Sequence, residues 1–376
     1  MRWRANGSGF WRRVLLMLVA LVLCRPAAWA METSQGRLSV VAVATGLKEP
    51  WSLAFLPDGG FLVTERGGRL WRQDAGGARV AVAGVPAVFA RGQGGLLDIL
   101  VPRDFAARGE VFFSFARPQG AGAGTGAGAG TAVARARLVE ARLEEVELIW
   151  EMPPGTSGGI HFGGRLAEAP DGTLFLTLGE RGAFDPAQRL DRLQGKIVHL
   201  TRDGRAAPGG PFPDAPFPEI HTLGHRNPQG LAFDAEGRLW ASEHGAMGGD
   251  EINLIEAGRN YGWPVIAYGR NYDGSAIGTG PARAGMEQPV HYWDPSIAPS
   301  GHMVYSGRLW PAWAGSHFVG SLKFDYIARL DPAAGWAEEA LRSGETGRVR
   351  DIREAPDGSI WFLSVDRGAV YRIAPE

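Results

Sequence analysis

One strand-turn-strand pattern recurs four times along this chain, and the spacing of its turns restricts the fold more than any other feature. In each copy, an apolar strand leads into a turn that ends in Gly, usually Pro-Asp-Gly, and a second strand follows. The turn glycines are Gly59, Gly172, Gly237 and Gly358. Their separations of 113, 65 and 121 residues fit two, one and two repeats of about sixty residues, so five intervals predict six repeats.

Six hairpin repeats are typical of an all-β, six-bladed β-propeller, in which each blade is a small antiparallel sheet. Long helical periodicity is nearly absent, and the 55 glycines suit a chain rich in turns. A pair of β-sandwiches is the alternative architecture. In a propeller, ligands bind on the loops at the mouth of the central channel. The Gly-Ala-Thr run over residues 120–130 is interpreted as a flexible loop insertion.

The first thirty residues have the pattern of an export signal. A basic start precedes the apolar run from Val14 to Leu23, and Ala28-Trp29-Ala30 is a small-x-small cleavage site. The run is about ten residues long, which is too short to cross a bilayer. We therefore expect residues 1–30 to be removed and residues 31–376 to form an exported propeller, periplasmic or secreted, without a stable membrane anchor. The only cysteine, Cys24, leaves with the signal, so no disulfide forms.

The charge balance excludes a nucleic-acid partner. Removal of the signal takes away five arginines and no acids, which leaves 34 basic and 40 acidic residues and a net charge near −6. Nucleic-acid binding needs clustered Lys and Arg, and no basic tract remains.

Polar residues are densest between residues 224 and 264. This block combines a permanent cation, an amide, carboxylates and two imidazoles among glycines that let a ligand approach the backbone, a composition that indicates a site. A purely structural β-turn region is the alternative. His225 and His244 lie in the block and are candidates to line a pocket. The other histidines after residue 161 are expected to be structural: His199, His221, His291, His302 and His317.

His161 and Glu180 form a second candidate pair. They lie nineteen residues apart on the two sides of a predicted hairpin, so both can reach the same end of one blade. An imidazole oriented by a carboxylate is a general base with its orienter. A histidine that only makes hydrogen bonds within its loop is the alternative.

Cations near the C-terminus form a third candidate group. Arg348 and Arg350 are expected on one face of a strand by alternation, and Lys323 lies in the preceding repeat. Together with Arg226, they come from distant repeats, and a ring of cations around one axis implies an anionic small molecule. Each taken singly fits a solvated edge strand equally well. Tyr272 is a candidate to stack on a planar ligand, and a core or surface tyrosine fits the sequence equally well.

In their order along the chain, these motifs resemble the soluble, exported aldose sugar dehydrogenases that use pyrroloquinoline quinone (PQQ), which are six-bladed propellers. The resemblance runs from about Gly46 to the C-terminus. The motifs that carry it are Gly92–Gly95, His161–Arg165, Leu193–Lys196, Arg226–Gly230, Glu243–Gly245, Gly249–Asn253, Asn260–Pro264 and Arg348–Arg350.

The resemblance implies roles for the candidate residues. His161 would remove the hydroxyl proton at the anomeric carbon of an aldose while a hydride passes to the quinone. Glu180 would orient His161, and Arg226 would stabilise the charge that develops on the quinone oxygen. The implied cofactor contacts are Gln93, Arg226, Asn227, Tyr272, Ser321, Leu322, Lys323, Arg348, Val349 and Arg350.

The resemblance also implies Ca²⁺. One ion would take the backbone carbonyls of Gly245 and Ala246, and a second would use Glu251 and the carbonyl of Tyr261. Ala246 stands where proline is common in the family. Because the ligand is a main-chain oxygen, this difference affects the rigidity of the turn more than the binding.

Two other function classes stay open. A calcium-dependent propeller hydrolase, such as a lactonase, needs side-chain carboxylates that converge on the metal and has no use for axial cations. A non-catalytic propeller that binds a protein or a glycan needs none of the cofactor motifs. The preferred aldose and the electron acceptor do not follow from the sequence.

Overall fold

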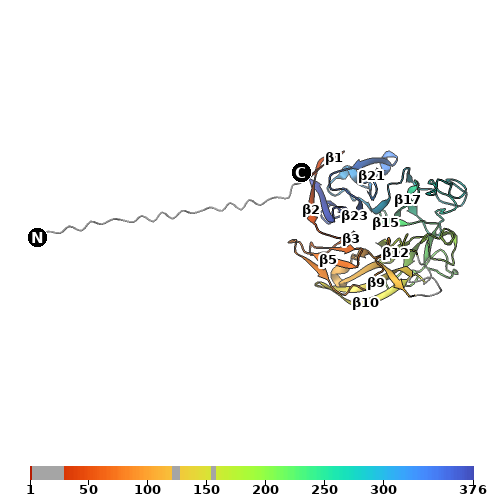
Figure 1. Ribbon diagram of the computed structural model, residues 1–376, viewed down its shortest axis with the longest axis horizontal. Helices are drawn as coiled ribbons and strands as arrows, with labels where there is room; N and C mark the ends of the chain where they lie inside the picture. Colours follow the sequence, from red (N-terminus) through yellow and green to blue (C-terminus); the bar gives the residue numbers. More distant parts are fainter. Residues whose placement is uncertain (2–28, 121–127, 154–157) are drawn as a thin grey trace.

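The computed structural model describes residues 1, 29–120, 128–153 and 158–376, which form six antiparallel sheets around a central axis (Figure 1). The predicted six-bladed β-propeller is therefore confirmed. The first strands of successive blades lie side by side and close a ring around the axis. Most of the predicted signal, residues 2–28, lies outside the described residues. In the described part of the chain, no helix has the length and apolar character needed to span a membrane.

Blades 1 to 3 follow one another along the chain. Blade 1 contains β3 (Pro50–Phe55), β4 (Phe61–Glu65), β5 (Arg69–Gln73) and β6 (Arg79–Val82). Blade 2 contains β7 (Leu96–Leu100), α1 (Phe105–Arg108), β8 (Glu110–Gln119), β9 (Gly128–Val139) and β10 (Arg142–Glu151). Blade 3 contains β11 (Leu166–Glu168), β12 (Leu174–Leu178), the 3₁₀ helix η1 (Asp185–Gln188), β13 (Lys196–Leu200) and β14 (Ile220–Leu223).

Blades 4 to 6 complete the ring. Blade 4 contains β15 (Pro228–Phe233), β16 (Leu239–Glu243), β17 (Asp250–Ile255) and β18 (His291–Trp293). Blade 5 contains β19 (Pro299–Val304), η2 (Pro311–Trp313), β20 (His317–Ser321), β21 (Ile327–Asp331), η3 (Pro332–Ala334) and β22 (Ala337–Leu341). Blade 6 contains β23 (Val349–Glu354), β24 (Ile360–Ser364), β25 (Ala369–Pro375), β2 (Gly36–Ala44) and β1 (Trp29–Thr33).

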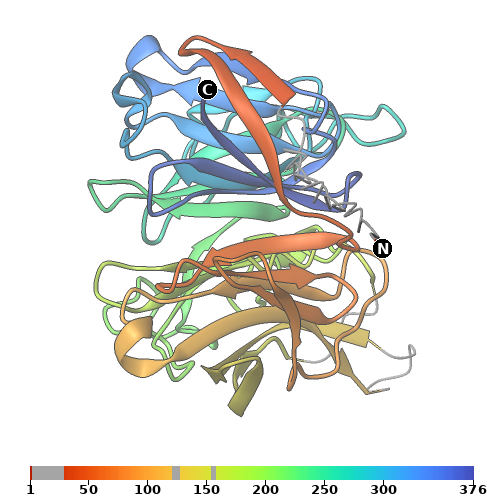
Figure 2. The same cartoon turned by 90° about the vertical axis from the view of Figure 1, so that its left-hand side faces the viewer.

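The two ends of the chain close the ring together. Strand β2 pairs antiparallel with β25, with Val40 opposite Ile373, so blade 6 contains strands from both termini. Figure 2 shows the N-terminal strands, in red, beside the dark blue C-terminal strands. This pairing covers sheet edges that would otherwise be open.

The four repeated turns lie where the spacing predicts them. They join the first two strands of blades 1, 3, 4 and 6, and their glycines have φ between 79° and 85°, which a residue with a Cβ rarely adopts. Blades 2 and 5 lack the motif because longer connections, which carry α1 and η2, join their first two strands. The predicted loop insertion over residues 120–130 is wrong at its end. Gly128 already pairs with Gln119 at the start of β9, and residues 121–127 lie outside the described residues.

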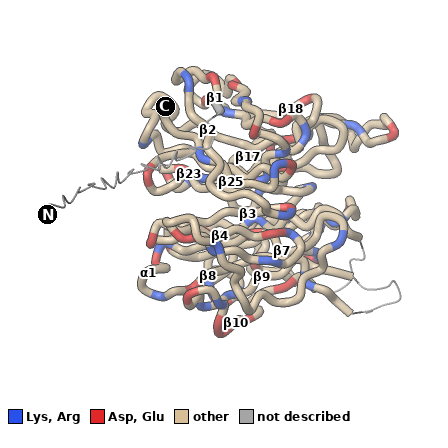
Figure 3. Tube along the Cα trace, turned by 60° about the vertical axis from the view of Figure 1, so that its left-hand side comes forward, with Lys and Arg blue, Asp and Glu red and all other residues tan. Residues whose placement is uncertain are grey.

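The core lies between the blades. All five residues of β4, β12, β16 and β20 are buried, because both faces of these second strands pack against other residues. The apolar clusters join neighbouring blades: Phe112 and Val133 of blade 2 pack with Leu176 and Val198 of blade 3. Acidic and basic residues are interspersed along the described chain (Figure 3).

Buried histidines make the stability of the fold depend on pH. Burial lowers the pKa of His221, and also that of His317, from 6.5 to about 4. Both side chains are therefore neutral in the folded protein at pH values where the unfolded chain binds a proton. Their contribution to stability is complete above pH 6.5 and is lost as the pH falls towards 4.

We expect the His221→Phe variant, which keeps the edge-on ring contact with Phe175, to lose part of this acid sensitivity. The free energy of unfolding, measured by urea titration at pH 7 and pH 5, should fall by about 1–2 kcal/mol less in the variant than in the parent. An equal fall in both proteins would contradict a neutral, buried His221.

Candidate active site

A cavity of about 660 Å³ opens at one end of the axis, and its wall contains residues of blades 1, 4, 5 and 6 and of the loops that lead into blades 2 and 3. A second cavity of about 450 Å³ adjoins it, and the two share His244, Ala298 and Lys323. A cavity of this size suits a small organic ligand. The dense polar block and the C-terminal cations therefore meet around one space.

Irregularities at the beginning of the first strands place side chains in the cavity. The strand register shifts near the start of β3, β7, β15, β19 and β23. The shifts in β3, β15 and β23 fall at Trp51, Gln229 and Arg350, and all three residues line the cavity. A β-bulge changes the direction of a side chain in this way.

Four cations line the main cavity. Lys323, Arg348 and Arg350 were predicted to share a site, and the structure adds Arg66 from the end of β4. Arg348 and Arg350 do not share a face by simple alternation: Arg348 precedes β23 with a φ of 42°, and Arg350 lies in the register shift. Arg226 does not line this cavity. Its side chain is buried and donates a hydrogen bond to the carbonyl of Gly245.

The cations differ in their partners. Arg66 forms an ion pair with Glu49, and Arg348 lies 3.7 Å from a carboxylate oxygen of Asp366. Arg350 has no carboxylate partner among the described residues and donates to Gln229 Oε1 at 3.0 Å. Burial, followed by the charges of Arg165, Arg348 and Arg66, lowers the pKa of Arg350 to about 9. Because arginine stays protonated in proteins, the lowered pKa of Arg350 means that its charge is buried and repelled by the neighbouring cations. A bound anion would stabilise this cluster of cations.

His161 and Glu180 contact each other, and His161 also contacts a residue of the cavity wall. The His161 Nδ1 is hydrogen-bonded to Glu180 Oε1, and the His161 backbone N–H donates to Gln93 Oε1 at 2.8 Å. The contact depends on Gly179, because a Cβ there would lie 2.0 Å from the carbonyl oxygen of His161. With Nδ1 directed at a carboxylate, the imidazole keeps Nε2 to accept a proton. His161 and Glu180 do not line the cavity themselves, but Phe162, the next residue in the chain, and Gln93, which accepts the His161 N–H, both line it.

The two histidines of the dense block differ. His244 lines both cavities, and its Nε2 donates to the carbonyl of Pro299 at 2.7 Å. Burial and then the charges of Arg226 and Arg350 lower its pKa to about 3, so the ring is neutral. His225 is fully buried between Glu243 and Thr222, which occupy both ring nitrogens. The expectation that His225 lines the pocket is therefore wrong.

The candidate calcium ligands lie beside the second cavity. Gly245 and Ala246 line it, and their carbonyls accept from Arg226 and from Ser296 Oγ respectively. Glu251 and Tyr261 line a small space of about 20 Å³, which Arg226 also lines and which shares Gly245 and Ala246 with the second cavity. Burial, and then the Glu243 and Asp250 carboxylates, raise the pKa of Glu251 to about 8.

This small space fits a cation. Glu251 pairs with Glu243 across β16 and β17, and both residues line the space. Two carboxylates directly opposite each other repel, and a cation between them would remove that repulsion. The volume is about that of one small ion or water. In the described part of the chain, no three His, Cys, Asp or Glu side chains converge in a way that would hold a metal, so backbone carbonyls would have to complete any ligand set.

The remaining predicted residues are placed as follows. Gln93, Asn227 and Leu322 line the main cavity, and Tyr272 is 76% exposed at the second cavity. Ser321 and Val349 line neither cavity: the Ser321 hydroxyl is buried and donates to the carbonyl of Ile297, and Val349 packs in the core of blades 5 and 6.

The sequence reasoning missed Trp51, Arg66 and Gln229 as cavity residues, although the repeat contains the signal. Trp51, Gln229 and Arg350 each lie eight residues before a turn glycine. Arg66 and His244 each lie seven residues after one. All five line the main cavity. Residues at the same position of the repeat therefore line the cavity in several blades.

Comparison with known proteins gives a consistent result. The family model "Glucose / Sorbosone dehydrogenase" matches residues 47–372. The chain is similar to "Aldose sugar dehydrogenase YliI" of Escherichia coli (strain K12), at 39% identity over 96% of this chain and 99% of that protein.

Two solved structures are also similar. One is a crystal structure of glucose dehydrogenase, at 43% identity and a TM-score of 0.85, with 90% of this chain and 99% of that chain covered. The other is the PQQ-bound form of aldose sugar dehydrogenase from Streptomyces coelicolor, at 32% identity and a TM-score of 0.73, with 90% and 98% covered.

The cation cluster predicts a response to polycarboxylates. We expect citrate, a tricarboxylate, to raise the Tm of the ligand-free protein by more than NaCl does at equal ionic strength, because a bound anion reduces the repulsion among the cations. The Arg350→Gln variant should lose most of this difference. Arg37→Gln is the control, since Arg37 is 61% exposed and pairs with Glu376. Equal stabilisation of the Arg350→Gln variant and the parent by citrate would show that these cations form no anion site.

Proposed function

Because the chain belongs to the glucose/sorbosone dehydrogenase family, we propose that it is an oxidoreductase that oxidises aldose sugars at the anomeric carbon to lactones, with PQQ as the hydride acceptor and Ca²⁺ as a second cofactor. The observation that carries the proposal is the cavity itself: four cations line it, and so does Gln93, which holds the backbone of the carboxylate-oriented His161.

The cavity suits a tricarboxylate quinone. Its cations, Arg66, Lys323, Arg348 and Arg350, would bind the carboxylates through charge-assisted hydrogen bonds, and Gln93 and Asn227 would supply amides. When bound, PQQ supplies a quinone that accepts a hydride. The carbonyls of Gly245 and Ala246 would hold one Ca²⁺, and Glu251 with the carbonyl of Tyr261 would hold another.

The protein's own residues would handle the proton. His161 Nε2 takes the proton of the anomeric hydroxyl, because Glu180 keeps Nδ1 protonated and fixes the ring. The buried Glu180 carboxylate also stabilises the imidazolium that results. Arg226 adds a fixed positive charge nearby: its Nη1 is held by the Gly245 carbonyl, and its buried Nε has no partner among the described residues.

We further propose that residues 1–30 are an export signal and that the mature chain begins at Met31. Strand β1 crosses this boundary, so cleavage would leave Met31 to Thr33 paired with β2. Met31 is fully buried in the core of blades 5 and 6. Its burial gives the mature N-terminus a fixed place in blade 6.

Reconstitution tests the proposed function directly. Purified protein without cofactor should be inactive towards aldoses and should reduce an artificial dye only after PQQ and Ca²⁺ are added. Nicotinamides should not substitute, because the sequence has no dinucleotide fingerprint at the start of a helix. Activity with NAD alone, or hydrolysis of lactones with Ca²⁺ alone, would contradict the proposal.

The role of His161 gives a second test. His161→Gln should lower kcat by about 10²–10⁴-fold, the range for loss of a general base, while PQQ still binds. Glu180→Gln should cause a smaller loss, because it disturbs the orientation and basicity of the ring without removing it. A PQQ-loaded His161→Gln variant with kcat near the parent value would transfer the role to another group, with His244 the first candidate.

A further inference from the structure

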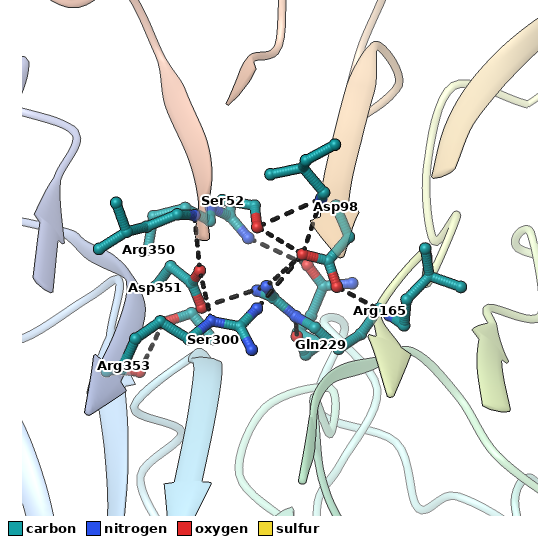
Figure 4. A network of polar contacts seen from close by, with 12 residues as sticks. Ser52, Asp98, Arg165, Gln229, Ser300, Arg350, Asp351 and Arg353 are labelled. Carbon is teal, nitrogen blue, oxygen red and sulfur yellow. Dashed lines mark hydrogen bonds and ion pairs between the residues drawn. The ribbon is translucent and has the colours of Figure 1, made fainter. Parts of the chain in front are cut away.

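Two buried carboxylates meet at the propeller axis, next to the cavity (Figure 4). Asp98 belongs to β7 and Asp351 to β23, and Arg165 lies between them. Arg165 Nη1 is 3.1 Å from Asp98 Oδ1 and 3.1 Å from Asp351 Oδ1. Each of the three side chains is 1% exposed, so the charges must be balanced within the protein.

Arg165 also contacts the floor of the cavity. Its Nε donates to the backbone carbonyl of Gln229 at 2.8 Å, and its guanidinium carbon lies 4.3 Å from the centroid of the Trp51 ring. Trp51 and Gln229 both line the cavity, and the Gln229 side chain accepts a hydrogen bond from Arg350. One guanidinium thus joins the axial carboxylates to three residues of the cavity wall, two directly and Arg350 through Gln229.

Arg353 provides an internal comparison. Its Nε is 3.0 Å from Asp351 Oδ2 and its Nη2 is 3.3 Å from Asp98 Oδ1, so it balances the same two carboxylates. Within the described residues, however, Arg353 has no hydrogen bond to Gln229 and no ring contact with Trp51. The two arginines therefore share the charge-balancing role, and of the two only Arg165 contacts Gln229 and Trp51 in the cavity wall.

We propose that Arg165 is a positioning residue of the cavity, which holds Trp51 and Gln229, and through Gln229 the Arg350 guanidinium, against the axial carboxylates. The proposal extends the proposed function and depends on it for one thing only, the identity of the ligand. A planar guanidinium is needed, because Nε and Nη1 donate in different directions while the ring of Trp51 lies on its face. A lysine keeps the charge but cannot make these contacts at once.

The test compares Arg165→Lys with Arg353→Lys. Both variants retain a cation beside Asp98 and Asp351, and only the first loses the contacts with the cavity floor. Isothermal titration of the apo-proteins with PQQ in the presence of Ca²⁺ should give a Kd raised about tenfold or more for Arg165→Lys and changed less than about twofold for Arg353→Lys. Equal affinities in all three proteins, or equal losses in both variants, would overturn the proposal.

A second readout needs no cofactor. The indole N–H signal of Trp51 in the NMR spectrum, identified by its absence in Trp51→Phe, should shift in apo Arg165→Lys and stay in place in Arg353→Lys. If the parent does not bind PQQ, the proposed function is wrong, and this signal alone decides the positioning role. An unchanged signal in Arg165→Lys would overturn it. If Arg165→Lys does not fold, the Asp98→Asn/Arg165→Gln double variant, which keeps the charge balance, takes its place with the same expectations.

Discussion

The propeller depends on two carboxylates that bind the backbone of neighbouring blades where the first strands meet. Asp351 of blade 6 accepts the N–H of Leu53 in blade 1, and Asp98 of blade 2 accepts the N–H of Leu166 in blade 3. The first strands of different blades do not pair with each other, so these hydrogen bonds satisfy backbone N–H groups that have no partner in a neighbouring strand. Buried carboxylates are unfavourable without compensating charges, and Arg165 and Arg353 together supply these charges.

The same strands supply both the fold and the site because their beginnings are irregular. A regular strand would alternate its side chains between the two faces of a blade. The register shifts in β3, β15 and β23 instead give the cavity an aromatic ring, an amide and a cation at equivalent positions. The strand framework is the same in each blade, and the residue type at each repeat position determines the chemistry of the cavity.

The sequence predicts the parts that local rules determine. A turn glycine with positive φ is a local requirement, so counting such glycines gives the number of blades. His161 and Glu180 are close in sequence across one hairpin, and their contact follows from that proximity. Arg66 was missed because only the alignment of repeats relates it to His244. His225 is buried because its ring is hydrogen-bonded to Glu243 and stacks on Tyr261, which lie in other segments of the chain. Sequence patterns do not predict such contacts.

The pairing of β2 with β25 makes the order of synthesis matter. Val40 emerges from the ribosome more than three hundred residues before its partner Ile373, so the ring stays open until translation is nearly complete. Contacts this distant in sequence slow folding and leave strand edges exposed in the meantime. Blade 6 is therefore the last sheet to be completed, because β2 lacks its partner strand until β25 has been synthesised.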